Sequence, residues 1–391
     1  MTHIPRLTSV VDTVRTEGVG WVWRRLQHRT PATAFGRAVH GRLRHALGAV
    51  LAPVRRLARV DARLVSPTVL YAFYDLQVSP LTHDAAWFVA GADRMRRQLN
   101  LDRVHFVVVP GALDGLRAER AVYEAAVDRE ARRWRLHNVV VAIFGLLPTG
   151  AGYTLLPDRQ SARALRADAG PHVYPRDYEP LLAVGHHPSE VLEAARAGES
   201  ELAVLHSPVQ AQRFVDRWLA ARLDGRRLVT ITLRDYPFMP ARNSDAEAWA
   251  AFARRLDRAR YLPVFVLDLE RTLDGAPPAL HGFELMPEAS VNVALRLALY
   301  ERAFLNLGVN NGPILMAALA PRTRLLIFKM ITASVPQTTE AFLEQLGFEV
   351  GGQLPFANPF QRLVWQDDRL EVIEREFAAM VSRIEAGGEV A

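Results

Sequence analysis

The chain has 391 residues, of which 50% are hydrophobic and 23% are charged, a balance that predicts a folded, soluble protein of two domains. It contains no cysteine, which excludes disulfides, thiolate metal sites and cysteine nucleophiles. The net charge is +6, but it is unevenly distributed: residues 1–60 hold eleven arginines against two acidic residues, and the remaining residues carry a net −3. Because the body of the protein is not basic, we do not expect nucleic acid as a partner.

Residues 1–65 form a basic arm in which Trp21, Trp23 and Leu26 alternate with arginines, a pattern that predicts amphipathic helices. Two interpretations remain open for this arm. It binds a membrane surface through residues 1–60, or its helices pack on the body and expose their arginines. The sequence shows neither a signal peptide nor an uncharged apolar run of about 18 residues, which predicts a cytoplasmic protein, peripheral to the inner membrane if the arm binds lipid.

Residues 66–180 alternate short apolar runs with helical patterns. The predicted strands are Val69–Tyr74, Val104–Val109, Val139–Phe144 and Tyr153–Leu156, and the predicted helices are Ala85–Gln98, Leu116–Trp134 and Arg159–Ala167. Continuous apolar strands separated by helices indicate a parallel sheet that is covered on both faces.

A second alternating series follows a proline-rich linker at 181–225. In the lobe at 226–365 the predicted strands are Leu228–Leu233, Leu262–Leu267, Phe304–Leu307 and Arg324–Phe328, and the predicted helices are Asp245–Ala259, Ser290–Ala303, Pro313–Leu319 and Thr338–Leu346. A last helix lies in 366–391, and one option for it is to cross back to the first lobe. The sequence thus predicts an α/β protein of two Rossmann-like βαβ lobes with an N-terminal helical arm and a cleft at the carboxyl ends of the strands.

The turn after the strand at 304–307 is a candidate phosphate site. Asn310, Asn311 and Gly312 lead into Pro313, which suits the start of a helix, and Asn suits its cap. The free N–H groups and the positive dipole at such a helix start attract phosphate. An ordinary capped helix after a strand is the alternative.

A second candidate is the arginine that follows the first strand of this lobe. Arg234 stands at the carboxyl end of that strand, and its planar fork can clamp a diphosphate. Arg242 and Asn243 lie on the next loop and suit the same role. The alternative is a surface arginine paired with Asp235 or Asp245.

The strand, the Asn310–Pro313 turn and the alanine-rich helix after it resemble the donor-phosphate loop of GT-B glycosyltransferases, especially heptosyltransferase-like ones, over residues 226–330. A strand followed by Arg234 is similar to the fucosyltransferase-like members. The resemblance implies donor-side residues that include Arg234, Arg242, Asn243, Asn310, Asn311 and Gly312. It also implies that Glu284 lies near the nucleotide base and that Glu301 reaches a ribose hydroxyl.

The first lobe is then expected to hold the acceptor and a general base. Asp75 follows the first strand and is our first choice, with His83 and Asp84 next, although Asp75 and Asp84 also suit a helix cap. His137-Asn138 lies at the wrong end of its predicted strand for a role in the cleft, and His186-His187 is interpreted as a pair of flexible-loop histidines.

Asp268-Leu-Glu270 resembles the metal motif of GT-A enzymes, but a loop or a ribose contact is favoured over a metal. The resemblance to GT-B glycosyltransferases implies a metal-independent glycosyltransferase without a cofactor, which moves a sugar from a nucleotide-sugar donor to a glycan, lipid or protein acceptor. A nucleotide-sugar epimerase or hydrolase of the same fold, and a non-catalytic scaffold in envelope-glycan assembly, are the alternatives.

Overall fold

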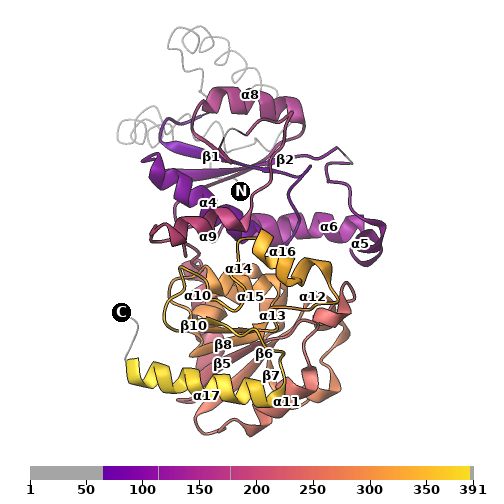
Figure 1. Ribbon diagram of the computed structural model, residues 1–391, viewed down its shortest axis with the longest axis vertical. Coiled ribbons are helices and arrows are strands. Elements are labelled where there is room, and N and C mark those ends of the chain that lie inside the picture. The colour runs from indigo at the N-terminus through magenta and orange to yellow at the C-terminus, as the bar shows by residue number, and fades with distance from the viewer. Residues whose placement is uncertain (1–64, 113, 177, 388–391) are drawn as a thin grey trace, which may run out of the picture. The chain divides into compact units, whose positions relative to one another are not determined.

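The computed structural model describes residues 65–387 except 113 and 177, so nearly all of the predicted N-terminal arm lies outside the described residues. Residues 66–391 form one compact unit with two all-parallel sheets, each with helices on both faces (Figure 1). The predicted α/β class with two Rossmann-like lobes is confirmed. No helix in the described part of the chain is long and apolar enough to cross a bilayer.

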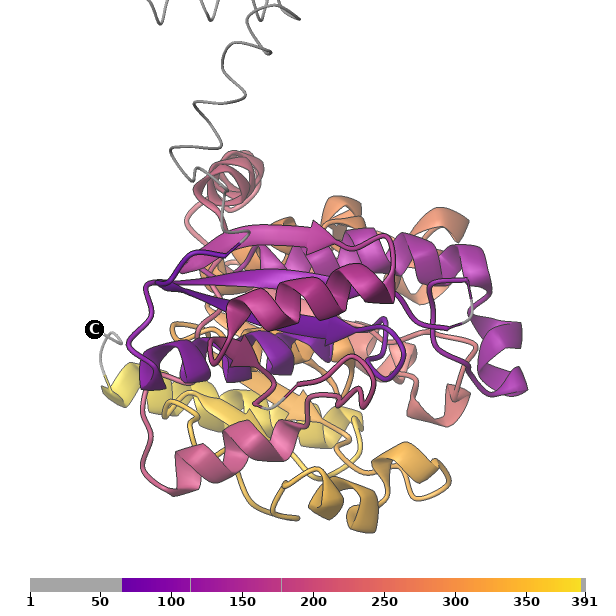
Figure 2. The same cartoon turned by 90° about the horizontal axis from the view of Figure 1, so that it is seen from above.

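The sheet of the first lobe has the strand order β3-β2-β1-β4. Its strands are β1 (Val69–Asp75), β2 (Arg103–Val109), β3 (Gly150–Leu155) and β4 (Val173–Tyr174), and its helices are α4 (Ala85–Gln98), α5 (Ala121–Ala126), α6 (Arg129–Arg135), α7 (Val141–Phe144), α8 (Arg159–Ala169) and α9 (Pro188–Arg196). Alternate residues of β1 and β2, such as Tyr74 and Phe106, share a core with Phe88 of α4. Helix α8 lies across the other face of the sheet (Figures 1 and 2).

The strand predicted at Val139–Phe144 is wrong. A π-helical turn (Leu136–Val140) continues from α6 and leads directly into α7, so residues 129–144 form one helical run. Val139, Val140 and Ile143 are all buried. Residues at positions i, i+1 and i+4 lie on one side of a helix, so this pattern of burial fits a helix that packs against the core. A short apolar run fits a buried helix as well as a buried strand, and here the helix forms because β3 takes the place at the sheet edge.

The sheet of the second lobe has the order β10-β9-β8-β5-β6-β7. Its strands are β5 (Arg227–Thr232), β6 (Tyr261–Val266), β7 (Glu284–Leu285), β8 (Leu305–Val309), β9 (Leu325–Phe328) and β10 (Gln361–Leu363). Counted along the chain within this lobe, the order is that of the dinucleotide-binding doubly wound sheet, 3-2-1-4-5-6. Its topological switch point lies between β5 and β8, where ligands of such sheets bind.

The helices of the second lobe divide between the two faces of its sheet. They are α10 (Val209–Ala220), α11 (Ala246–Arg255), α12 (Leu269–Asp274), α13 (Pro287–Val291), α14 (Val293–Arg302), α15 (Gly312–Ala318), α16 (Glu340–Gln345) and α17 (Leu370–Gly387). The last helix, α17, packs on α11, with the rings of Phe377 and Phe252 centred 5.2 Å apart. It therefore stays in the second lobe and does not cross back to the first.

A continuous apolar core joins the two lobes. Phe144 of α7 belongs to the same buried cluster as Leu297 of α14 and Ile314 of α15. Between the lobes, the backbone N–H of Leu205 donates to the carbonyl of Leu319 at 2.9 Å. The seam between the lobes is thus packed like the interior of a domain.

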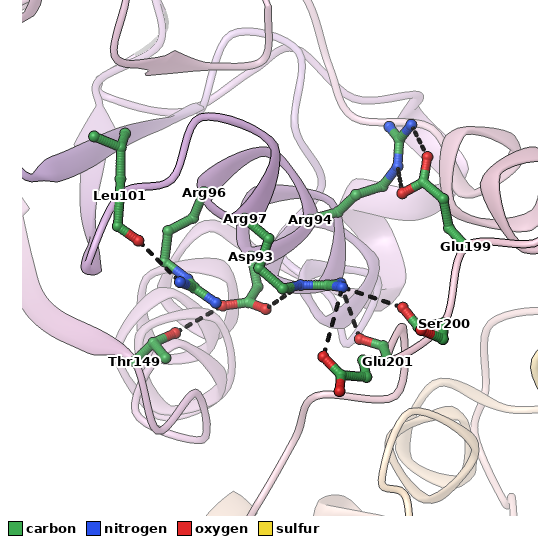
Figure 3. A network of polar contacts seen from close by, with 9 residues as sticks. All are labelled: Asp93, Arg94, Arg96, Arg97, Leu101, Thr149, Glu199, Ser200 and Glu201. Atoms are coloured by element: carbon green, nitrogen blue, oxygen red, sulfur yellow. Dashed lines mark hydrogen bonds and ion pairs between the residues drawn. The ribbon is translucent and has the colours of Figure 1, made fainter.

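A polar network ties α4 to the linker between the lobes (Figure 3). Asp93 is buried and accepts hydrogen bonds from Thr149 Oγ1 at 2.7 Å and from Arg97 Nε at 3.2 Å. The guanidinium of Arg97 also donates to two backbone oxygens of the linker. Arg94 pairs with Glu199 through two hydrogen bonds of 2.6 and 2.8 Å. The network fixes the path of the chain where it leaves the first lobe.

Candidate functional site

A cavity of about 280 Å³ lies at the switch point of the second sheet, between the carboxyl ends of its strands and the first lobe. Residues of both lobes line it. Those of the first lobe include Thr82, His83, Asp84, Tyr123, Trp134, Arg135 and Asn138. Those of the second lobe include Arg234, Tyr236, Phe238, Arg242, Asp268, Ser290, Arg296, Asn311 and Gly312. The cavity therefore brings together seven residues that the sequence singled out as candidates: His83, Asp84, Arg234, Arg242, Asp268, Asn311 and Gly312.

Arg234 follows β5 and points into this cavity from a buried position, 7% exposed. Its Nη2 donates to the carbonyl of Phe238 at 2.5 Å, and its Nη1 donates to Asn243 Oδ1 and to the carbonyl of Met239. These acceptors carry no net charge, and burial lowers the pKa of the guanidinium. Arg234 is therefore not a surface arginine paired with Asp235 or Asp245, and that alternative is wrong. It is a buried cation in the cavity wall, and these hydrogen bonds fix its position.

Arg242 lines the same cavity at the end of the loop that Arg234 organises. Its Nη2 donates to the carbonyl of Asn310 at 3.0 Å, which connects the β5 loop to the β8 loop. Burial, and next to it the charge of Arg234, lower the pKa of Arg242 to about 10. Asn243 and Asn310 do not line the cavity. Asn243 Oδ1 accepts from Arg234 and from the backbone of Tyr236, and Asn310 Nδ2 donates to the carbonyl of Met330.

Arg296 of α14 is a cavity residue that the sequence analysis missed. It is 3% exposed, and its Nε and Nη2 donate to the carbonyls of Ala289 and Leu267 at 2.7 and 2.9 Å. Its third nitrogen, Nη1, is buried and has no hydrogen-bond partner within the described residues. The signal in the sequence is an arginine on a helix that is apolar on every side, between Val293 and Leu297.

Two more buried polar atoms of the cavity wall have no partner in the described part of the protein: Asn311 Nδ2 and Ser290 Oγ. Asn311 is the predicted cap of α15, and its Oδ1 accepts from Ile314 N at 3.0 Å. Its amide nitrogen therefore has no partner in this part of the protein. Buried polar groups are nearly always paired, so three unpaired groups around one cavity indicate a site for a ligand that accepts hydrogen bonds.

His83 packs directly on the turn before α15. A Cβ placed on Gly312 would lie 2.9 Å from His83 Cβ, so only glycine leaves room for this imidazole. Burial, reinforced by the charges of Arg296 and Arg135, holds the pKa of His83 well below its ordinary value of 6.5. The imidazole is therefore neutral at physiological pH and able to accept a proton.

The other two candidate bases lie in different surroundings. Asp84 is exposed and lines the cavity, and its Oδ2 accepts from Thr82 Oγ1 at 2.9 Å; no cap hydrogen bond from its side chain to α4 is present. Asp75 is fully buried and outside the cavity lining. Its carboxylate pairs with Arg159 at 2.8 and 2.9 Å and accepts from Tyr178 Oη at 2.6 Å. This environment makes Asp75 a structural anchor and does not suit a base on a substrate.

The acidic residues proposed to contact the nucleoside also differ in whether they line the cavity. Glu284 of β7 pairs with Arg222 at 3.2 Å, and Glu301 accepts from the backbone N–H of Ser207 at 3.1 Å; neither lines the cavity. Asp268, at the end of β6, does line it, and its Oδ2 accepts from the backbone N–H of Asp235 at 2.9 Å.

Part of the first-lobe wall of the cavity comes from the helical run at 129–144, next to the segment that the sequence assigned to a strand. Trp134, Arg135 and Asn138 all line the cavity. The sequence pattern predicts 137–138 at the end of a strand that points away from the cleft, and for Asn138 that interpretation is wrong. Arg135 Nη2 donates to Tyr236 Oη at 2.9 Å across the cavity. The ring of Tyr123 meets that of Phe238 edge-on at 5.1 Å.

The histidine pair at 186–187 is held in place. His186 shares a hydrogen bond of 3.0 Å between its Nε2 and the carbonyl of Asp84, and its ring stacks on Tyr74 at 5.7 Å. Burial lowers its pKa to about 4. His187 Nδ1 accepts from the backbone N–H of Ser189 and caps α9. Both side chains support the loops beside the cavity.

The described lining carries four arginines and two carboxylates around a neutral histidine, so the cavity favours an anion. The arginines approach from three directions, from the β5 loop, from α14 and from the first lobe. This arrangement can hold a multiply charged group such as a diphosphate.

The sequence matches no protein-family model and no curated protein. Among solved structures, the chain is similar to E. coli ADP-heptose lps heptosyltransferase II (TM-score 0.44, 9% identity, 81% of this chain and 99% of that one). It is also similar to E. coli heptosyltransferase WaaC with ADP (0.43, 11%, 80% and 100%). A third structure is the glycosyl transferase family 9 protein from Veillonella parvula DSM 2008 (0.38, 11%, 68% and 81%).

Proposed function

We propose that the cavity binds the diphosphate of a nucleotide sugar and that the protein transfers the sugar to a hydroxyl group of a glycan, lipid or protein acceptor. The observation that carries the proposal is the set of three buried, unpartnered groups, Arg296 Nη1, Asn311 Nδ2 and Ser290 Oγ, on one cavity at the switch point of a doubly wound sheet.

The arginines supply the positive charge that the leaving group requires. When the bond between the sugar carbon and the phosphate oxygen breaks, negative charge grows on the diphosphate, and fixed cations nearby stabilise it. Arg234 and Arg296 are both held by carbonyl oxygens before the ligand arrives, so they need little rearrangement. We propose that the transfer is metal-independent because these side chains take the role that a divalent ion has elsewhere.

We propose His83 as the general base of an inverting transfer. The acceptor oxygen forms the new bond to the sugar carbon, and its proton passes to the neutral imidazole. Bound diphosphate would offset the charges of Arg296 and Arg135 and so raise the pKa of His83, which makes the base stronger only when donor is present. Asp84 is the alternative base in the same wall.

The nucleoside is placed toward β6 in this proposal. Asp268 lies two residues after the second strand of the doubly wound order, where an acidic residue commonly binds a ribose hydroxyl. A second cavity of about 130 Å³ adjoins Arg234 and Asp268 on that side. It offers the nucleoside a position beside the phosphate site.

The test is binding of nucleotide sugars and free nucleotides to purified protein, measured by thermal unfolding. A ligand at a hundredfold excess over its Kd adds about 2.7 kcal/mol to the free energy of unfolding. Stabilisation by a nucleoside diphosphate and its sugar, but not by the nucleoside alone, is expected. No response to any nucleotide would contradict the proposal. Turnover of the donor without any acceptor would instead indicate an epimerase or hydrolase.

A further inference from the structure

A short turn of the first lobe exposes three large apolar side chains outside the cavity. Leu181, Leu182 and Val184 are 74%, 78% and 50% exposed. The turn is ordered by a hydrogen bond of 3.0 Å from Leu182 N to the carbonyl of Glu179. Single exposed apolar residues are common on protein surfaces, but three within four positions form a concentrated patch.

The base of this turn is rigid. Tyr178 is fully buried, its ring stacks on Phe73 at 4.7 Å, and its hydroxyl donates to Asp75. Arg159 pairs with Asp75 and also donates to the carbonyl of Pro180, at the start of the turn. The buried ion pair therefore holds the two leucines out in solvent and prevents them from folding back onto the lobe.

We propose that this apolar turn inserts into the interfacial region of a lipid bilayer. A stable protein–protein interface needs about 800 Å² and some 20–30 residues on each side, far more than this turn offers. A bilayer needs no complementary surface and takes up single apolar side chains according to the area that they bury.

The charges around the turn favour insertion that does not depend on anionic lipid. Arg166 donates to the carbonyl of Tyr178 at 2.6 Å and pairs with Glu179 at 3.3 Å. Arg159 is paired with Asp75 in the same way. Because these two cations are matched by carboxylates, we expect the attraction to come mainly from the apolar side chains.

The turn adjoins the first-lobe wall of the cavity. His186, two residues after Val184, bonds to the backbone of Asp84, which lines the cavity. Insertion of the turn would hold that wall close to the membrane surface. The consequence that a lipid-linked acceptor reaches the cavity rests on the proposed function, whereas insertion itself does not.

The chain has no cysteine, so Leu182→Cys provides a single attachment point for an environment-sensitive fluorophore in the full-length protein. With phosphatidylcholine vesicles, we expect a blue shift of the emission and a loss of intensity to nitroxide-labelled lipid. Added phosphatidylglycerol or salt leaves the shift unchanged. The matched control is Val209→Cys, at a site that is 61% exposed in the second lobe, where no shift is expected.

A Leu182 label that stays unchanged when the protein co-sediments with vesicles would overturn the proposal, because another segment would then make the contact. Equal shifts at both labels would overturn it as well. The readout requires no enzymatic activity, so its outcome is separate from that of the nucleotide-binding test. Circular dichroism of each variant is the check that the fold is retained.

Discussion

Replacement of Arg296 by methionine separates its role in the ligand site from its role in the fold. Methionine fills much of the same volume without the charge or the donors. Two of the three guanidinium nitrogens bond to the carbonyls of Ala289 and Leu267, and the third, Nη1, is buried without a hydrogen-bond partner within the described structure. The proposal assigns that third nitrogen to a phosphate oxygen.

The expected size of the effect follows from these contacts. A hydrogen bond from a charged donor contributes about 1.5–3 kcal/mol, and each 1.4 kcal/mol is a factor of ten in Kd, so Arg296→Met should weaken nucleoside diphosphate binding about 10- to 150-fold. The two carbonyls left without a donor each cost about 1–3 kcal/mol in the free energy of unfolding, and the removal of a desolvated charge offsets part of that.

The assay is isothermal titration of the purified variants with the nucleoside diphosphate that stabilises the wild type most. Arg302→Met is the matched control, because Arg302 lies on the same helix but pairs with Asp216 at the surface. That exposed pair contributes about 0–1 kcal/mol, so the control should bind normally. If folded Arg296→Met binds as tightly as the wild type, the assignment of Nη1 to phosphate is wrong.

Four further predictions test the same structure. Gly312→Ala should lower the transfer rate more than nucleotide affinity because its Cβ would displace His83, whereas Gly185→Ala, whose Cβ would meet Val78 at 3.8 Å, should be neutral; equal rates would refute the packing argument. The His83 imidazole, followed by NMR, should titrate at higher pH with nucleoside diphosphate than without it. Because burial lowers its folded pKa, His83 should also make the free energy of unfolding fall as pH drops below about 6.5, and His83→Phe should reduce that dependence, the remainder coming from buried histidines such as His186. Asp75→Asn should cost about 2–4 kcal/mol in urea unfolding, because it leaves Arg159 without its buried partner; a smaller loss than 1 kcal/mol would contradict its structural role.

The fold class could be predicted because the buried strands are continuous apolar runs between helical patterns. The order of the strands could not, since it depends on which strand pairs with which, and this order places the switch point between β5 and β8. The run at 139–144 was assigned to the wrong element for a local reason. Its apolar residues satisfy a strand face and a helix face equally, and only the competition with β3 for the sheet edge decides between them.

The parts of the site that follow strands were predictable, and the parts on helices were not. Arg234 and Asn311 are found where parallel strands end, which is where ligands of such sheets bind. Arg296 lies within a helix whose sequence suits a buried structural role, and nothing local shows which way its third nitrogen points. Asp75 also ends a strand, but Arg159, 84 positions along the chain, neutralises it. Long-range partners of this kind are not visible in sequence spacing.

The apolar seam shared by α7, α14 and α15 limits how a substrate can enter. Many two-lobed proteins open and close by rotation about a hinge, which requires an interface that separates at little cost. Here rotation would expose side chains such as Phe144 and Leu297 that are buried in one core. Access to the cavity is therefore expected to depend on the Tyr123–Phe238 and Arg135–Tyr236 contacts that bridge its wall. The rate of ligand entry would then be a property of side-chain gating, with the lobes as a fixed frame.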